Sequence, residues 1–223
     1  MGSNAGRRTG FLVIFAAYFA VLWLLWDTPV VYPLKIFVVL VHELAHAAAV
    51  LATGGTVEGI TLTADQGGAA YTQGGNAFVS LSAGYLGSVA FGLLLLGLAR
   101  ARASRARLAL AALGILLVAA AVVYMRGGFG LFFCLAFGAA LLLAARWLNP
   151  AGQTALLTTL GLTSALYAVL DIRSDVLERP LVDSDASLLA QMTGIPTIVW
   201  GVAWMAVALL ACWWALRRAW YRA

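Results

Sequence analysis

The sequence predicts an all-α polytopic membrane protein of about six to seven transmembrane helices, with a small β-hairpin or re-entrant loop. Hydrophobic residues make up 63% of the chain, charged residues only 10%, and the mean hydropathy is +0.95; in soluble domains roughly a quarter of residues are charged. The apolar runs suit the ~20 residues that a helix needs to cross ~30 Å of hydrocarbon. Nearly every residue lies in or beside such a run, so we expect residues 1–223 to form a single membrane-embedded domain.

Seven apolar runs are candidate spans. The first follows "GRRTG" and leaves through the bulky "LLWDTP". This exit lacks the small-residue cleavage pattern of a signal peptide, so we expect a retained span. The predicted spans are about 10–26, 34–52, 77–99, 108–125, 128–146, 154–171 and 197–216.

Two polar stretches interrupt these runs. Residues 53–76 combine glycine pairs with β-branched residues and short alternation, which predicts a hairpin or re-entrant loop. Residues 172–196 hold four of the nine acids, counted from Asp175. This second stretch predicts a short interfacial helix near "DSDASLLAQM", with Ser184 or Asp185 as its N-cap.

The only two histidines of the chain lie in the apolar stretch "FVVLVHELAHAAAVLATGG", residues 37–55. Positions i and i+4 share one face of a helix, so His42 and His46 can present two imidazoles to one point with Glu43 beside them. This is the HExxH arrangement of zinc peptidases, which supplies two metal ligands and a general base. Shuffling the composition produces it in roughly one sequence in 10⁴, so accident explains it poorly.

A purely structural role is the alternative for this cluster. His42 and Glu43 could pair with each other or with backbone carbonyls and so tie spans together. That role explains one polar residue more easily than three. Ionisable groups at membrane depth are functional by default, so we favour the metal site.

A catalytic zinc takes three protein ligands and keeps one position open. With no histidine left, the third ligand is expected to be a carboxylate. We predict Asp171, in "LYAVLDIRSD", because it is the acid most continuous with an apolar helix; Asp175, one turn further on, competes with it. Alternatively, Asp171 could bind no metal and simply end its span, paired with Arg173. The other acids considered are Glu58, Asp65, Asp183 and Asp185.

The expected depths of His42 and Asp171 in the membrane set a condition on Asp171 as the third ligand. His42 lies about 12 Å along its helix from Leu34 and is mid-span, whereas Asp171 ends its span. For the two to meet, residues 171–176 would have to enter the membrane as a broken helix beside a wet cavity.

Several motifs together resemble one family. "HELAHAAAVLATGG", "GGAAYTQGG", "SAGYLGS", "LDIRSD" and "SDASLLAQMTGIP", between residues 37 and about 201, look like the M50 site-2-protease clan of intramembrane zinc metalloproteases, in its M50B-like bacterial branch. The resemblance implies a Zn²⁺ cofactor bound by His42, His46 and an aspartate, with Glu43 activating water. The clan's Asn-Pro-Asp-Gly motif is altered here to "LNPAG", with Ala151 at the aspartate position, and the likeness of "LDIRSD" to the branch points to Asp171 as its replacement.

The expected function is that of an intramembrane zinc metalloprotease, which hydrolyses peptide bonds of a membrane-anchored protein within or near its transmembrane segment. Its expected partners are a transmembrane protein substrate and the lipid bilayer, with no nucleic acid. The hairpin of residues 53–76 would hold an extended substrate by strand pairing, and "SAGYLGS" would pack closely against the HExxH helix.

Two other functions compete with proteolysis. An inactive protease-like scaffold fits Ala151, and a metal transporter fits the metal ligands but lacks further histidines along a path. The bias towards Ala, Leu, Gly and Arg suggests a bacterial plasma membrane.

Overall fold

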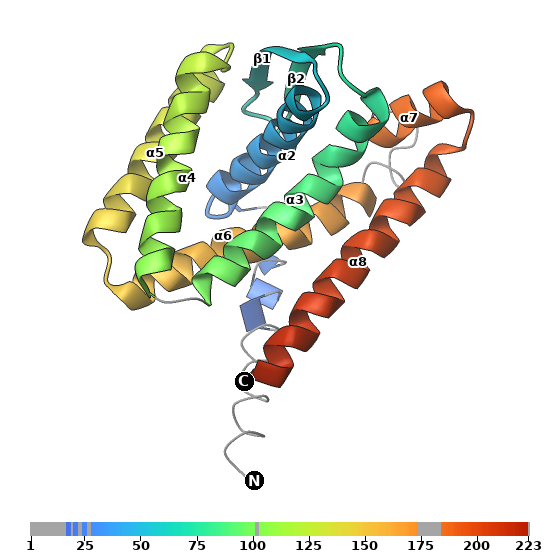
Figure 1. The fold of residues 1–223 in the computed structure, drawn as a ribbon. Coiled ribbons are helices and arrows are strands. Elements are labelled where there is room, and N and C mark those ends of the chain that lie inside the picture. Colours follow the sequence, from blue (N-terminus) through green and yellow to red (C-terminus); the bar gives the residue numbers. More distant parts are fainter. Residues whose placement is uncertain are drawn as a thin grey trace.

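A computed structural model describes residues 17–18, 20–21, 24–25, 28–100, 103–173 and 184–222, and shows a helical bundle with one small hairpin (Figure 1). The hairpin follows the first long helix, α2, and together with α3 and α6 it encloses that helix. In chain order the elements are α2 (Tyr32–Ala52), β1 (Thr56–Leu62), β2 (Gly68–Gln73), α3 (Ala77–Ala99), α4 (Ala103–Val123), α5 (Gly128–Trp147), α6 (Pro150–Arg173), α7 (Asp185–Thr193) and α8 (Thr197–Arg222).

Five of the described helices, α2, α3, α4, α5 and α8, are long and apolar enough to cross a membrane. They correspond to the predicted spans 34–52, 77–99, 108–125, 128–146 and 197–216, and the predicted all-α polytopic fold with a small hairpin is confirmed. The predicted span 10–26 lies mostly outside the described residues. The span 154–171 is helical as part of α6.

Helix α2 is the central element of the bundle. Within its most apolar window 61% is buried, against 17% for α8 at the periphery. Residues 36–41 of α2 are buried on every side, with Phe37 and Leu40 fully inaccessible. A helix that is apolar all round is stable only when it is enclosed, and here α3, α6 and the hairpin enclose it.

Small residues allow α3 to approach both α2 and α6 closely. Gly92 of α3 faces Gly161 of α6, where a Cβ added to either would lie under 3 Å from the other's carbonyl oxygen. Ser164 Oγ donates to the Ser88 carbonyl, 2.9 Å away, across the same contact. Such small-residue seams replace the hydrophobic driving force that is missing between helices in lipid. The expected packing of "SAGYLGS" against the HExxH helix is confirmed, since Gly84 and Gly87 both face α2.

The hairpin has one covered edge and one free edge. Strands β1 and β2 pair antiparallel, as expected for residues 53–76. On the outer side of β1, Ile60 N–H donates to the Tyr124 carbonyl and Arg126 N–H donates to the Ile60 carbonyl, both at 2.8 Å. The α4–α5 connection therefore occupies the edge of β1, and the described part of the chain offers no strand to the outer edge of β2.

The short helix α7 begins at a capping box. Ser184 is the N-cap and its side chain accepts from Ser187 N–H, while Ser187 Oγ accepts from Ser184 N–H. These two bonds satisfy amides that would otherwise lack partners. Gly194 ends the helix in the left-handed conformation, at φ 73°. The predicted short helix is confirmed, with Ser184 rather than Asp185 as the cap.

Candidate active site

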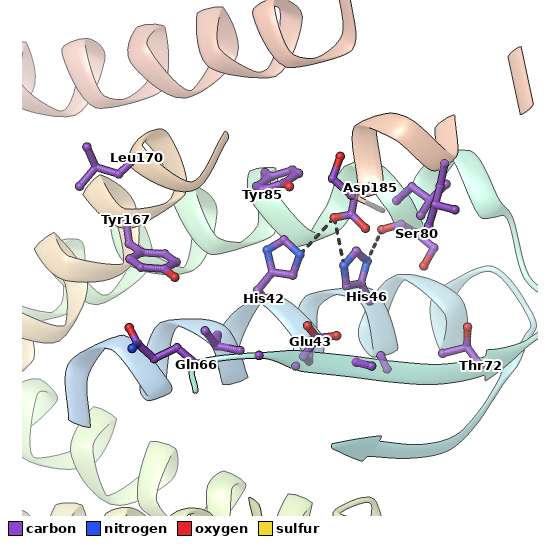
Figure 2. Close-up of a pocket in the computed structure, with 18 of the residues that line it drawn as sticks. His42, Glu43, His46, Gln66, Thr72, Ser80, Tyr85, Tyr167, Leu170 and Asp185 are labelled. Carbon is purple, nitrogen blue, oxygen red and sulfur yellow. Dashed lines mark hydrogen bonds and ion pairs between the residues drawn. The ribbon is translucent and has the colours of Figure 1, made fainter. Parts of the chain in front are cut away.

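Two helices far apart in the sequence bring three potential metal ligands to one point. Helix α2 supplies His42 and His46, and the first residue of α7 supplies Asp185 (Figure 2). Asp185 Oδ2 lies 3.1 Å from His42 Nε2 and 3.2 Å from His46 Nε2. The ligand atoms of these three side chains all lie within 4.8 Å of one another, and among the described residues they form the one such group. The predicted convergence of the two imidazoles is therefore present in the fold.

A backbone carbonyl of α3 determines which nitrogen of His46 carries a proton. His46 Nδ1 lies 2.7 Å from the Ser80 carbonyl oxygen, which can only accept, so Nδ1 carries a proton and donates it. In a neutral ring Nε2 then holds a lone pair, directed at a carboxylate oxygen 3.2 Å away. Two lone pairs at this distance repel unless a cation lies between them, either a second proton on the ring or a metal ion. The bond to Ser80 is the outer contact that commonly orients a metal-binding histidine.

The donor set and its spacing fit zinc. Two imidazole nitrogens with one carboxylate oxygen are a common catalytic zinc set, and bonds of about 2.0–2.1 Å place tetrahedral ligands about 3.3–3.4 Å apart. The nitrogen-to-oxygen distances of 3.1 and 3.2 Å are close to that spacing. Three protein ligands would leave one position for water or substrate.

Asp185 is held in its ionised form. Its removal from water opposes ionisation, but when the His42 and His46 rings are protonated, their hydrogen bonds and positive charges outweigh that cost and lower the pKa of the carboxyl to about 2. The carboxylate is thus charged at neutral pH, as a metal ligand must be.

Glu43 lies on the side of the imidazoles opposite Asp185, between the imidazoles and strand β2 (Figure 2). Its side chain is buried, at 7% exposure, and the backbone of Ala70 hydrogen-bonds to it. Ala70 pairs with Ile60, whose own N–H and C=O bond outward to the α4–α5 connection. In an antiparallel pair, two directly opposite residues point their N–H and C=O groups either both towards each other or both away from each other. Those of Ile60 point away from β2, so those of Ala70 point away from β1, to the free edge of β2. That edge and the Glu43 carboxylate therefore adjoin each other.

A cavity of about 800 Å³ opens over these groups. Its walls come from α2, the hairpin, α3, α6 and α7, and Figure 2 shows Tyr167 and Leu170 of α6 at one end and Thr72 and Ser80 at the other. Tyr85, 1% exposed, closes one side with its ring 4.8 Å from that of His42. The site thus combines titratable groups with an open cavity.

The remaining predicted acids have different positions. Asp171 lies in α6, which continues unbroken to Arg173, but its side chain is outside the described part of the structure. Asp175 and Asp183 also lie outside the described residues, so the prediction of Asp171, or Asp175, as third ligand stays a prediction. Asp65, at the hairpin turn, lines the cavity.

Asp185 is the acid that the structure places beside both histidines. From the sequence, Asp185 was expected at the start of a helix. The one feature that could have pointed to it as a ligand is its place next to the N-cap Ser184, because the cap holds the start of α7 in a fixed position.

Gly68 leaves the space that Glu43 occupies. A Cβ added at residue 68 would lie 2.8 Å from Glu43 Oε1 and 2.8 Å from Val39 Cγ1. We expect Gly68→Ala to displace the Glu43 carboxylate; if Glu43 is the general base of a hydrolytic site, the rate should fall by about 10- to 100-fold, since misplacing a reacting group by about 1 Å has effects of this size. Bound zinc should not change. Cleavage rate and metal content of the purified variant would check this.

Gly67→Ala is the matched control for this substitution. A Cβ at residue 67 would meet Thr63 Oγ1 at 2.7 Å, on the same turn but away from Glu43. Equal losses in both variants would mean that the turn conformation, and not the position of Glu43, limits activity.

Comparison with known proteins agrees with this geometry. Residues 15–215 match the family described as Peptidase M50B-like. Searches of curated proteins and of solved structures gave no match. Five apolar helices and this match identify an integral membrane protein. Because the matched region covers nearly the whole chain, including both histidines, Glu43 and Asp185, the protein belongs to the Peptidase M50B-like family of membrane peptidases.

Proposed function

We propose that this protein is an intramembrane zinc endopeptidase that cleaves a membrane-anchored protein within or near its transmembrane segment. His42, His46 and Asp185 would bind the zinc ion, and Glu43 would act as the general base. Asp185 takes the role that the sequence alone suggested for Asp171. The family match and the membrane-spanning helices support the peptidase class and its location.

One observation carries the proposal. His42 Nε2, His46 Nε2 and Asp185 Oδ2 meet at one point, while the other nitrogen of His46 is occupied by the Ser80 carbonyl. A structural cluster would need only enough partners to satisfy each polar group. This cluster instead leaves donor atoms facing one another, an arrangement that a metal cation relieves.

The chemistry would be peptide hydrolysis. Bound zinc would supply Lewis-acid activation of the scissile carbonyl and of the attacking water. Glu43, buried beside the imidazoles, would take a proton as the water oxygen bonds to the carbonyl carbon. It would then deliver that proton to the nitrogen as the carbon–nitrogen bond breaks, releasing an amine and a carboxylate.

The free edge of β2 would hold the substrate. Because the Ala70 N–H donates to Glu43, the Ala70 carbonyl is the group at this position that an extended peptide could meet as it adds to the edge through main-chain hydrogen bonds. A substrate helix must unwind to present this backbone, because its own amides are otherwise paired within the helix. The anchoring of β1 by Tyr124 and Arg126 would keep the edge in place during binding.

The setting favours a substrate from the bilayer. His42, Glu43 and His46 lie in the interior of the apolar helix α2. Because α2 is enclosed by other helices, water and substrate would meet in the cavity rather than in lipid. We further propose that the membrane is a bacterial plasma membrane, from the composition of the chain.

Metal analysis of detergent-purified protein would test the proposal. We expect about one zinc per chain in wild type prepared without chelator, and almost none in the double variant His42→Ala/His46→Ala. A single-span reporter protein in liposomes should be cut by the wild type within or near its span, and not by the double variant.

Other results would change the assignment. A folded wild-type protein without zinc would contradict the peptidase and favour an inactive scaffold. Weak, rapidly exchanging metal without cleavage would favour transport.

A further inference from the structure

Helix α3 contributes no metal ligand, yet its inner face lies directly against both imidazoles. Ser80 accepts from His46 Nδ1, and Tyr85 packs against the ring of His42. Gly84 lies one turn after Ser80 on the same face. A Cβ added at Gly84 would lie 2.6 Å from His46 Nε2 and closer still to His42 Nε2. Real nonbonded carbon and nitrogen atoms do not approach this closely, so a side chain here must displace the rings.

The backbone of α3 has little freedom to move away from the histidines. Ser88 Oγ donates to the Gly84 carbonyl at 2.8 Å, and Ser164 Oγ of α6 donates to the Ser88 carbonyl at 2.9 Å. Ser88 and Ser164 are both buried. On the far side, Gly92 already meets Gly161 of α6 at the limit of close packing. An added methyl group at residue 84 is therefore accommodated by the imidazoles rather than by the helix.

We propose that Gly84 is a positioning residue of the metal site. The bare α-carbon at residue 84 lets α3 close over the Nε2 atoms of His42 and His46, so that both point at Asp185. Any side chain there would compete for the space beside their lone pairs. This inference rests on the proposed zinc site. It adds the requirement that residue 84 be glycine, which the HExxH motif does not include.

The test compares zinc binding by wild type, Gly84→Ala and Gly87→Ala in detergent. Gly87 is the matched control, since its added Cβ would meet Ala45 Cβ at 2.6 Å, in the same contact of α3 with α2 but away from the imidazoles. Alanine favours helix over glycine, so neither substitution should weaken α3 itself. We expect Gly84→Ala to weaken zinc binding by about 10- to 100-fold, the range seen when groups that orient metal ligands are lost. Gly87→Ala, which meets Ala45 and no imidazole, should weaken zinc binding clearly less than Gly84→Ala.

Cobalt(II) provides a readout that is independent of hydrolysis. The visible absorption of bound cobalt reports the number and geometry of its ligands. We expect a spectrum of tetrahedral type in wild type and in Gly87→Ala, and a weakened or altered spectrum in Gly84→Ala. Unchanged zinc affinity and an unchanged cobalt spectrum in Gly84→Ala would overturn the inference and leave the zinc peptidase intact. Equal losses in both variants would also overturn it, because general helix packing would then be responsible.

A folding defect would not obscure the result. If Gly84→Ala is unstable because its methyl group meets the imidazoles, removing them in His42→Ala/His46→Ala/Gly84→Ala should restore the thermal stability of His42→Ala/His46→Ala. Failure of that rescue would place the constraint in the backbone and contradict the inference. Absence of zinc from wild type would instead contradict the proposed function, and the positioning role with it.

Discussion

Replacing Glu43 by glutamine is expected to stop peptide hydrolysis while leaving the metal in place. Glutamine keeps the size of the side chain and its contact with the Ala70 backbone, but it cannot take a proton from water. Because Glu43 is not one of the three converging ligands, zinc content should equal that of wild type. Loss of a general base lowers rates by about 10²- to 10⁴-fold. Cleavage of the single-span reporter in liposomes, with zinc measured on the same preparation, would check both parts.

The value of Glu43→Gln lies in separating catalysis from metal binding. Gln66, another residue of the cavity wall, offers a control: Gln66→Ala changes the wall without touching the base or the three ligands. A Glu43→Gln protein that still cleaves at the wild-type rate would exclude Glu43 as the base. Loss of zinc from this variant would show that Glu43 belongs to the metal site itself.

Replacing Asp185 by alanine is expected to remove zinc and activity together. Its Oδ2 is the one described carboxylate oxygen within 3.2 Å of both imidazoles. Loss of a direct ligand should weaken zinc binding by more than the ~100-fold that outer contacts reach. Helix α7 should survive, because the capping bonds of Ser184 and Ser187 do not involve Asp185. Zinc titration and circular dichroism would measure the two effects.

Asp171→Ala is the decisive companion variant. If Asp185 is the third ligand, Asp171→Ala should keep zinc at the wild-type level. Zinc lost from Asp171→Ala and retained in Asp185→Ala would restore Asp171 as the ligand and require a different arrangement of residues 171–185. If both variants keep zinc, Asp175→Ala would test the remaining candidate, and loss of zinc from it would identify Asp175 as the third ligand.

The elements that could be predicted most directly from the sequence are those that depend on interactions between neighbouring residues. Twenty or so apolar residues predict a span wherever they occur, and five predicted spans appear as apolar helices. The glycine pairs and β-branched residues of 53–76 predict a hairpin, and β1 and β2 form it. Ser184 predicts a helix start because a side chain at the N-cap satisfies amides three residues away. Each of these signals acts over a few neighbouring residues.

Helix α6 combines apolar residues with several polar side chains. Its residues continue as a helix to Arg173, and threonine and serine side chains lie among its apolar residues. Those polar groups bond within the bundle, as Ser164 does to Ser88 and Thr158 does to Thr154. A sequence window cannot distinguish polar side chains that face protein from polar side chains that would face lipid.

The sequence by itself determined that the protein lies in a membrane and that two histidines and a glutamate share one helix face, because helix periodicity and the length of apolar runs are local properties. Only the tertiary structure brought Asp185 to His42 across 143 positions. That meeting depends on α7 packing against α3 and α8, with Leu189 buried in one cluster with Tyr85 and Trp204. Long-range contacts of this kind depend on how whole surfaces fit, so the sequence pointed to Asp171, the acid most continuous with an apolar helix, and could not show that the fold places Asp185 beside both imidazoles.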